Sequence, residues 1–475
     1  MLIFMKPRIM ANSGGKNTMS KLLSGTIIAT CCALMAACSE SDSVSQQSGA
    51  AASGNELVLV AVEQALLGSS EGLAELISPG FENLSGLNTG APGYLWAYKS
   101  LNDLCREIQV QNSNIVSTES ALIVKHEFVA TCAEFGGLGP AETSEFVLEQ
   151  EFGFSEENTL ANVKTDFSRN GESVLPSLGV APTKPIRPPG SVLSSFDKGA
   201  FIEGLAVDKG GTVYVSLILD NNIWRIEKDG SKSIFATLPF DSNRQIMQGI
   251  FCLDIDAEGN FFVSVNSPDE SIRGIWKLSP DAQPVLWAQV PGPAVLNGID
   301  VDEDGNVFVA DTLSGTIWHV DSTHSAGQMA QVWVSHPILN PTPFVNVWPG
   351  INGVRRSNTG VSASVSDTGL VVDFDWNTKA PRIVTKGAGV DDFIIDNRGR
   401  YVLTTHPYNS IEIYDPQVDD RYSLFTEQEG VWGPAAVGSF ALSESKALYY
   451  VGTDGGLFGR GFANAFQAQV FKFEY

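Results

Sequence analysis

The segment NGIDVDEDGNVFVA (297–310) shows the pattern that decides the fold: an apolar stretch, an acidic turn containing glycine, and a second apolar stretch. The same pattern recurs in EGLAVDKGGTVYVS (203–216), FCLDIDAEGNFFVS (251–264), NGVRRSNTGVSASV (352–365) and DDFIIDNRGRYVLT (391–404). Each stretch is typical of two strands joined by a tight turn. Such units, repeated every ~40–55 residues, indicate a β-propeller.

A sixth unit lies near the end of the chain. GSFALSESKALYYVGTDGG (438–456) supplies two strands and QVFKFEY (469–475) a third. The short segment SVLSSF (191–196) precedes the first unit, and we expect it to complete the last blade and close the ring. The sequence therefore predicts an all-β, six-bladed propeller over residues 191–475.

The repeats share a constant register. Five residues before each turn stand Glu203, Phe251, Asn297, Asn352 and Asp391. Innermost propeller strands line the central channel, and their first residues lie at one mouth of it, so four oxygen-bearing side chains are expected to converge there. Two carboxylates and two amides suit one divalent cation, calcium first, with magnesium, manganese or zinc as alternatives. The other interpretation is that Asn-Gly and Glu-Gly only serve tight backbone geometry.

Further polar residues follow the second strands: Asn266, Asp311 and His406. These positions open at the same mouth, and His406 is the candidate acid or base, because imidazole titrates near neutral pH. The alternative interpretation is that His406 is a loop residue beside Pro407 with no role in the site. Asp392 either adds a second carboxylate to the site or points into its blade, the direction that strand alternation favours.

The net charge and the length of the chain limit the possible partners and the number of domains. Lys+Arg 30 against Asp+Glu 54 gives a net charge of −24, which repels nucleic acid. The 475 residues exceed one ordinary core, so a second domain is expected. No oligomeric state is predicted.

The N-terminal residues resemble a targeting signal. Residues 1–38 contain an apolar run that ends in Met35-Ala36-Ala37-Cys38, similar to a bacterial lipobox with Cys38 as the lipidated residue. Such a cleaved signal peptide implies an outer-membrane lipoprotein facing the periplasm, held to the membrane by this lipid anchor only; a secreted form is the alternative. A Ser-, Gly- and Ala-rich tether (39–54) follows.

Residues 55–172 differ from the repeats and predict a smaller α+β domain. Helical periodicity in 56–77 and 93–104 precedes alternating segments near 106–115, 121–131, 144–152 and 159–167. The layout resembles the nuclear transport factor 2-like fold. Cys105 and Cys132 flank an expected hairpin turning near residue 118, which makes a disulfide reasonable in an oxidising compartment. Residues 173–190 form a Pro-rich linker.

The propeller segment, about 186–475, resembles the regucalcin/gluconolactonase (senescence marker) family. The resemblance rests on Glu203 in IEGLAV, Asn297 in NGIDVD, Asn352 in INGVRR and Asp391 in VDDFIID, which match that family's metal ligands in order and blade number. It implies a metal-dependent hydrolase in which the cation activates water and polarises a lactone or ester carbonyl. Asp391 or a neighbour, with His406 as a second candidate, would take the proton.

One departure bears on the substrate. Sugar-lactone members carry an arginine where this chain has Val295, so a more apolar small-molecule lactone or ester is expected. The alternative function is a non-catalytic envelope propeller that binds a ligand or protein around a structural metal.

Overall fold

The computed structural model describes residues 54–84, 90–118, 120–174, 179–244, 247–281, 283–344, 349–443, 446–460 and 464–475. The predicted signal peptide, Cys38 and the tether up to residue 53 lie outside these residues. No helix within the described ranges is long and apolar enough to cross a membrane.

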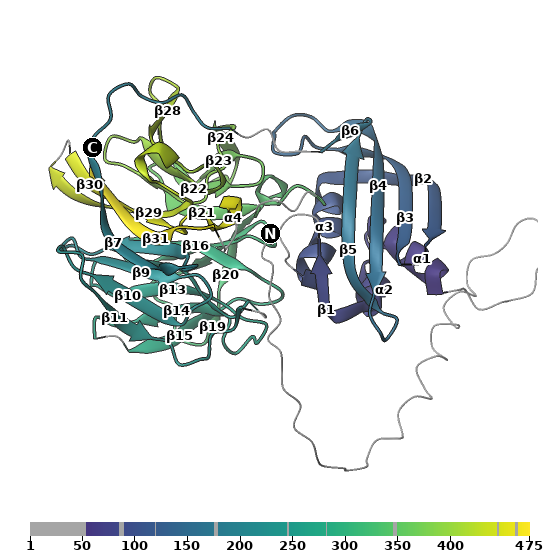
Figure 1. The fold of residues 1–475 in the computed structure, drawn as a ribbon, viewed down its shortest axis with the longest axis horizontal. Helices are drawn as coiled ribbons and strands as arrows, with labels where there is room; N and C mark the ends of the chain where they lie inside the picture. The colour runs from purple at the N-terminus through teal and green to yellow at the C-terminus, as the bar shows by residue number, and fades with distance from the viewer. Residues whose placement is uncertain are drawn as a thin grey trace, which may run out of the picture. The chain divides into compact units, whose positions relative to one another are not determined.

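The first part of the described chain is a mixed sheet with three helices (Figure 1). Its elements are α1 (Gly54–Leu66), α2 (Glu71–Leu76), β1 (Ile77–Asn83), α3 (Gly90–Leu104), β2 (Cys105–Ser117), β3 (Leu122–Cys132), β4 (Glu142–Phe154), β5 (Leu160–Arg169) and β6 (Glu172–Ser173). The sheet order is β1-β5-β4-β3-β2, and β6 pairs with β5. Alternate residues of β3 are fully buried against the helices, as expected for a strand with one covered face. The likeness to the nuclear transport factor 2-like fold stays a prediction.

Two details of this sheet concern the sequence patterns. The helical pattern of 56–77 is broken into α1 and α2, because Gly68 adopts a left-handed φ of +102° between them. Ile77, expected as the last residue of that helix, instead begins β1, which runs parallel to β5. Cys105 and Cys132 face each other across the β2–β3 hairpin and are joined by a disulfide.

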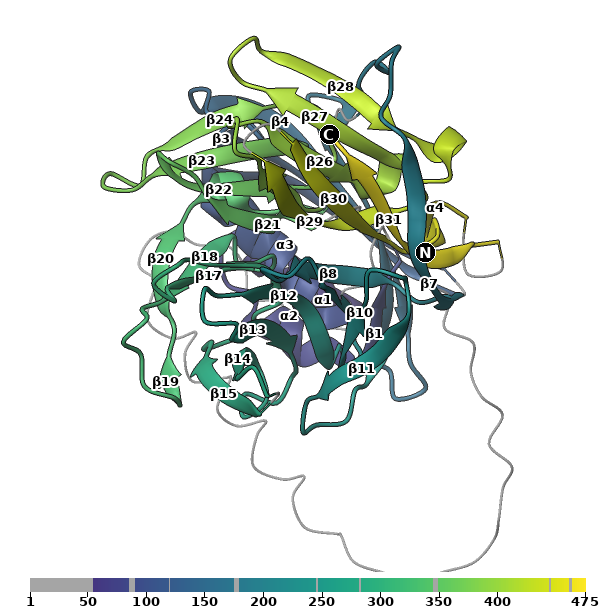
Figure 2. The same ribbon diagram turned by 90° about the vertical axis from the view of Figure 1, so that its left-hand side faces the viewer.

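The rest of the described chain forms six sheets arranged as propeller blades (Figure 2). Blade one holds β8 (Ile202–Val207), β9 (Val213–Leu217), β10 (Asn222–Ile226) and β11 (Lys232–Thr237). Blade two holds β12 (Gly249–Ile255), β13 (Phe261–Asn266), β14 (Gly274–Leu278), β15 (Pro284–Gln289) and the short β19 (Gln328–Met329). Blade three holds β16 (Leu296–Val301), β17 (Val307–Asp311), β18 (Thr316–Val320) and β20 (Gln331–Ser335).

The remaining blades follow the same plan. Blade four holds β21 (Ile351–Arg356), β22 (Gly360–Val365), β23 (Leu370–Asp375) and β24 (Pro381–Thr385), and blade five holds β25 (Phe393–Ile395), β26 (Tyr401–Thr405), β27 (Ser410–Asp415) and β28 (Asp420–Phe425). Blade six holds β29 (Pro434–Ser443), β30 (Lys446–Thr453), β31 (Gln467–Glu474) and β7 (Gly190–Lys198). Short helical turns are η3 (Pro337–Leu339), η4 (His406–Tyr408), η5 (Glu427–Glu429) and α4 (Leu457–Arg460).

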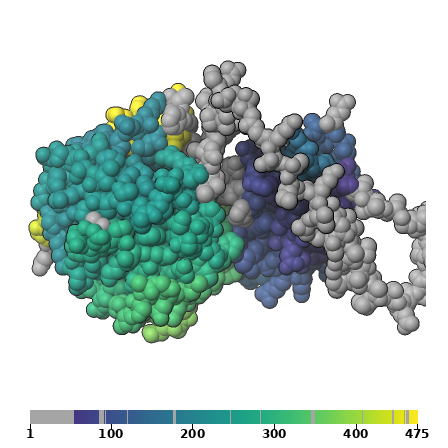
Figure 3. Space-filling model, turned by 90° about the horizontal axis from the view of Figure 1, so that it is seen from below, coloured from purple at the N-terminus to yellow at the C-terminus, as the bar shows by residue number. Residues whose placement is uncertain are grey.

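The blades form a closed ring. The innermost strands contact one another in the order β8, β12, β16, β21, β25, β29 and back to β8. The pairing of β7 with β31 confirms that the segment before the first repeat completes the last blade. In the space-filling view, the teal and green segments of the blades pack into a continuous surface (Figure 3).

The acidic turns that mark the repeats are held by their first side chain. Asp208, Asp256, Asp302 and Asp396 each accept two backbone N–H groups of their own turn through one carboxylate oxygen, at 2.7–3.0 Å. Such Asx turns fix the hairpin between first and second strands. This explains why the acidic, glycine-bearing pattern recurs at a constant position in the sequence.

The described second half of the Pro-rich linker is docked on blade five. Thr183 pairs with Ser423 of β28, and the Ala181 N–H donates to the buried Glu412 carboxylate at 3.0 Å. The segment therefore covers the outer edge of β28, which would otherwise present unpaired backbone groups.

Candidate metal-binding site at the channel mouth

The four predicted donors begin or precede innermost strands and share one backbone feature. Glu203, Asn297 and Asn352 each lie at a β-bulge, where the register shifts between the first and second strands of the blade. Asp391 stands just before β25. All four residues are buried, with exposed fractions of 3–7%. A bulge re-aims a side chain at the end of a strand, which is how these positions turn toward the channel.

Glycines follow three of the donors and are required by close packing between blades. A Cβ on Gly298 would lie 2.5 Å from the Asn352 carbonyl oxygen, and one on Gly353 would lie 2.8 Å from Asp392. Gly204 similarly faces the backbone of Cys252 at 2.8 Å. The Asn-Gly and Glu-Gly pairs thus combine both interpretations of the sequence: glycine permits the approach of neighbouring strands, and the residue before it carries the donor.

A series of hydroxyl groups ties each bulge to the preceding blade. Ser216, Ser264, Ser364 and Thr404 sit on second strands and donate to the carbonyls of Phe251, Asn297, Asp391 and Ala435, at 2.6–3.2 Å. Each bond crosses from one blade to the next. The backbone of two donor positions, Asn297 and Asp391, is therefore held by the preceding blade as well as by its own blade.

The donor side chains contact one another in pairs. The Asn352 amide donates to one Asp391 oxygen and to Ser366 at 3.0 Å. Burial raises the pKa of Glu203 well above its usual range; the Asp391 charge raises it further, and a hydrogen bond with Asn297 acts in the opposite direction. The second carboxylate oxygen of Glu203 is buried without a hydrogen-bond partner.

His406 joins the site from the loop after β26. Its Nδ1 lies 3.1 Å from Asp391 Oδ2, its Nε2 lies 3.0 Å from Asp454 Oδ2, and its ring packs 5.1 Å from that of Phe201. Burial alone would lower the pKa of His406, but the two carboxylates outweigh it and raise the pKa well above the usual range. The imidazolium is thus clamped between two carboxylates.

Asp454 is a site residue that the repeat pattern did not identify. It follows β30, is fully buried, and accepts the Gly456 N–H at 2.6 Å through its other oxygen. Blade six lacks the acidic turn that aligned the other blades. If the second strands are aligned instead, with TTH (404–406) of blade five on GTD (452–454) of blade six, Asp454 takes the position equivalent to that of His406.

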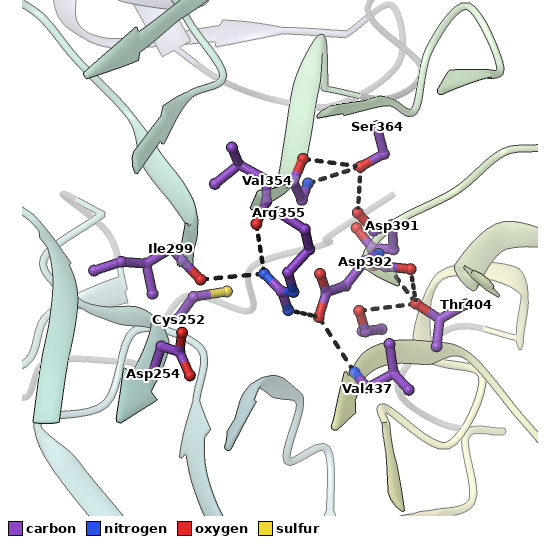
Figure 4. Close-up of polar contacts among 12 residues, drawn as sticks. Cys252, Asp254, Ile299, Val354, Arg355, Ser364, Asp391, Asp392, Thr404 and Val437 are labelled. Atoms are coloured by element: carbon purple, nitrogen blue, oxygen red, sulfur yellow. Dashed lines mark hydrogen bonds and ion pairs between the residues drawn. The ribbon is translucent and has the colours of Figure 1, made fainter. Parts of the chain in front are cut away.

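The other polar residues of the second-to-third-strand loops serve the backbone. Asn266 exchanges hydrogen bonds with both backbone groups of Leu296, and Asp311 accepts the Val295 N–H at 3.0 Å. Asp392 points away from Asp391 and forms an ion pair with Arg355 at 2.8 Å (Figure 4). Cys252 is buried, and its sulfur lies 3.5 Å from the Asn297 side-chain oxygen.

The residues present fit a hard divalent cation. The donor chemistry is two carboxylates and two amides, and one buried Glu203 oxygen is unpaired. In the part of the chain that the structure describes, no three His, Cys, Asp or Glu side chains are grouped to hold a metal. The candidate set differs from such a group in that half of its donors are amides. The identity of these ligands stays a prediction.

Solved structures of six-bladed propellers are similar to this chain over about 60% of its length. The calcium-binding protein regucalcin from Agrobacterium tumefaciens is 14% identical, with 62% of this chain and 95% of that chain covered and a TM-score of 0.43. A gluconolactonase from Xanthomonas campestris is 13% identical, covering 63% and 98%, with a TM-score of 0.43. Virginiamycin B lyase from Staphylococcus aureus is 14% identical, covering 56% and 83%, with a TM-score of 0.39. Likenesses at this level say nothing of activity. The sequence matches no protein family model and no curated protein.

Proposed function

We propose that this protein is a metal-dependent hydrolase of a small lactone or ester. The proposal is supported by the hydrogen bond between Asn352 and Asp391, by the proximity of Glu203 to Asn297 and Asp391, and by one buried Glu203 oxygen that is unpaired. A divalent cation held by these oxygens supplies a Lewis acid that acidifies water and polarises a carbonyl. Calcium suits the oxygen set best, with magnesium, manganese or zinc as alternatives.

The residues of the chain divide the remaining work. Asp391, held by Asn352 and His406, takes a proton from the water molecule while the oxygen of that water attacks the acyl carbon. The same proton then passes to the leaving alkoxide when the acyl–oxygen bond breaks. The His406 ring contacts Asp391 through Nδ1, and Asp454 fixes the ring through Nε2. Val295, in the position where sugar lactonases carry arginine, favours an apolar acyl chain.

A binding function is the second candidate, and the geometry of His406 favours it. Both ring nitrogens are engaged by carboxylates, at 3.1 and 3.0 Å, so the imidazole is placed to hold Asp391 rather than to exchange protons with a substrate. In this alternative the cation is structural and the propeller binds a ligand or a protein.

One experiment separates these functions. The purified full chain, loaded with calcium, manganese or zinc, is assayed on lactones and aryl esters beside Asn352→Ala and Asp391→Ala. Hydrolysis by the wild type that falls at least ~100-fold in both variants supports the hydrolase. Equal rates in all three proteins overturn it, and metal binding without any hydrolysis supports the binding function.

We also propose that the protein is an outer-membrane lipoprotein anchored through Cys38. The support is the lipobox-like MAAC sequence (35–38) and the tether that follows it. Cys38→Ser should then release the protein into the soluble fraction and abolish incorporation of labelled fatty acid. Unchanged membrane association of this variant would refute the anchor.

A further inference from the structure

The guanidinium of Arg355 lies inside the channel, in a setting that resembles a cation site. Arg355 extends from β21 and donates to the carbonyls of Val354 and Ile299 at 2.7 and 3.1 Å, and to Asp392 at 2.8 Å (Figure 4). Two backbone carbonyls and a carboxylate are the ligand types that hard divalent cations take. The arginine therefore occupies oxygens that a metal ion could otherwise use.

More negative groups surround this guanidinium than one arginine neutralises. Its positive charge is favoured by Asp392, Asp300 and Asp254, in that order, and Arg356 pairs with Asp300 at 2.6 Å. Burial, and then the neighbouring Asp300 charge, raise the pKa of Asp254 to about 7. The other oxygen of Asp392 is buried without a hydrogen-bond partner. Without the guanidinium, Asp392 would lose its ion-pair partner, whereas Asp300 would keep its ion pair with Arg356.

This setting adjoins the four-donor site directly. Asp392 follows Asp391 in the chain, and the Cys252 thiol, whose pKa is raised by burial and lowered in turn by the Arg355 charge, lies 3.5 Å from the Asn297 side-chain oxygen. The Asp391–Asp392 backbone is held independently of Arg355, because Thr404 bonds Asp392 N at 3.0 Å and Asp391 N donates to Thr404 O at 2.8 Å. Removal of the arginine charge should therefore leave the donor geometry in place.

We propose that Arg355 is a built-in cation that fills a second cation position in the channel, so that the propeller binds one divalent ion at its mouth and not two. This inference rests on the proposed metal site. Arginine suits the role because its planar, permanently charged fork reaches three acceptors at once, which a lysine ammonium on the same strand does less well. Arg355 thus determines the stoichiometry of metal binding.

The test is the number of calcium ions bound by the full chain, measured by equilibrium dialysis and titration calorimetry with calcium alone. We expect one ion for the wild type and two for Arg355→Gln, which removes the charge but keeps an amide donor. Arg355→Lys, which keeps the charge, should bind one. Arg382→Gln is the matched control, since Arg382 also pairs with a buried aspartate, Asp373 at 3.2 Å, outside the channel; it should bind one.

The outcomes separate this inference from the metal site itself. One ion in both wild type and Arg355→Gln overturns the inference and leaves the metal site standing, and two ions in the wild type overturn it as well. If the wild type binds no calcium, the proposed metal site at the mouth is wrong. In that case one ion bound by Arg355→Gln supports a cation position filled by the guanidinium, and no ion bound by this variant refutes it. If Arg355→Gln does not fold in chelator, it is refolded in excess calcium: a folded variant with two bound ions supports the inference, and failure to fold in calcium as well overturns it.

Discussion

Replacement of Glu203 by glutamine should change the stability of the protein in opposite directions without and with a divalent cation. In the absence of cation, Glu203 is a buried carboxyl group with one unpaired oxygen, next to the Asp391 charge. A buried polar group without a partner costs about 1–3 kcal/mol, whereas a glutamine amide can donate to Asp391. We therefore expect Glu203→Gln to be more stable than the wild type by about 1–3 kcal/mol in chelator.

The cation reverses the comparison. A ligand at 100 times its dissociation constant stabilises the folded state by about 2.7 kcal/mol, provided that it binds only the folded state. The wild type should gain this amount in calcium, and the variant, which lacks one of two ligand carboxylates, should gain close to none. The assay is urea denaturation followed by tryptophan fluorescence, in chelator and in calcium, which reports the propeller because every tryptophan except Trp96 lies there.

Glu412→Gln is the matched control. Glu412 is also a buried glutamate whose pKa is raised by burial, but it accepts the Ala181 N–H and pairs with Arg421 outside the site. Its replacement should lower stability in both buffers and leave the calcium response intact. A Glu203→Gln variant that is less stable than the wild type in chelator, or that keeps the full calcium response, would refute the reasoning.

Three further predictions concern single groups. Burial raises the pKa of Asp367 to about 7, so between about pH 4 and 7 the folded state holds a proton that the unfolded state has lost. Over this pH range the stability of the wild type should fall by up to about 4 kcal/mol relative to Asp367→Asn. Parallel pH profiles of the urea midpoints of the two proteins would contradict this. The double variant Cys105→Ser, Cys132→Ser opens a loop with a sequence separation of 27 and should cost about 3–4 kcal/mol of unfolding free energy. A urea midpoint that does not change when the wild-type disulfide is reduced would contradict this. Ser264→Ala removes the bond to the Asn297 carbonyl and should cost about 1–3 kcal/mol and weaken calcium binding; calorimetry showing unchanged affinity would exclude a role in positioning Asn297.

The repeated hairpins can be predicted from the sequence because the residues that fix each hairpin turn are close together in the chain. Asp208 and its counterparts bond to their own turns, so each hairpin carries its marker within a few residues, and the register of Glu203, Asn297, Asn352 and Asp391 follows from it. His406, predicted at the same mouth, lies 3.1 Å from Asp391. Asp454 was missed because blade six has no such turn, and the alignment had nothing to start from.

Other features depend on contacts that no local pattern records. The pair Arg355-Arg356 looks like an ordinary charged strand end, and only closure of six blades places the first of them against Ile299 and Asp392. Likewise, the Pro-rich linker has the composition of a free spacer, yet Ala181 is buried because Glu412 lies under it. In both cases the partners lie in distant parts of the chain.

The pairing of β7 with β31 sets the order in which the protein can finish folding. Residues 190–198 have no partner strand until residues 467–474 have been synthesised, and such a long loop must be closed at a cost in chain entropy before the pairing is gained. Apart from the short β19, which joins blade two from between β18 and β20, the strands of blades one to five follow one another in the chain and can pair early, so the last step is the joining of the propeller's first strand to its last. Until β7 joins, β31 presents an open edge, which leaves the unclosed ring prone to edge-to-edge association.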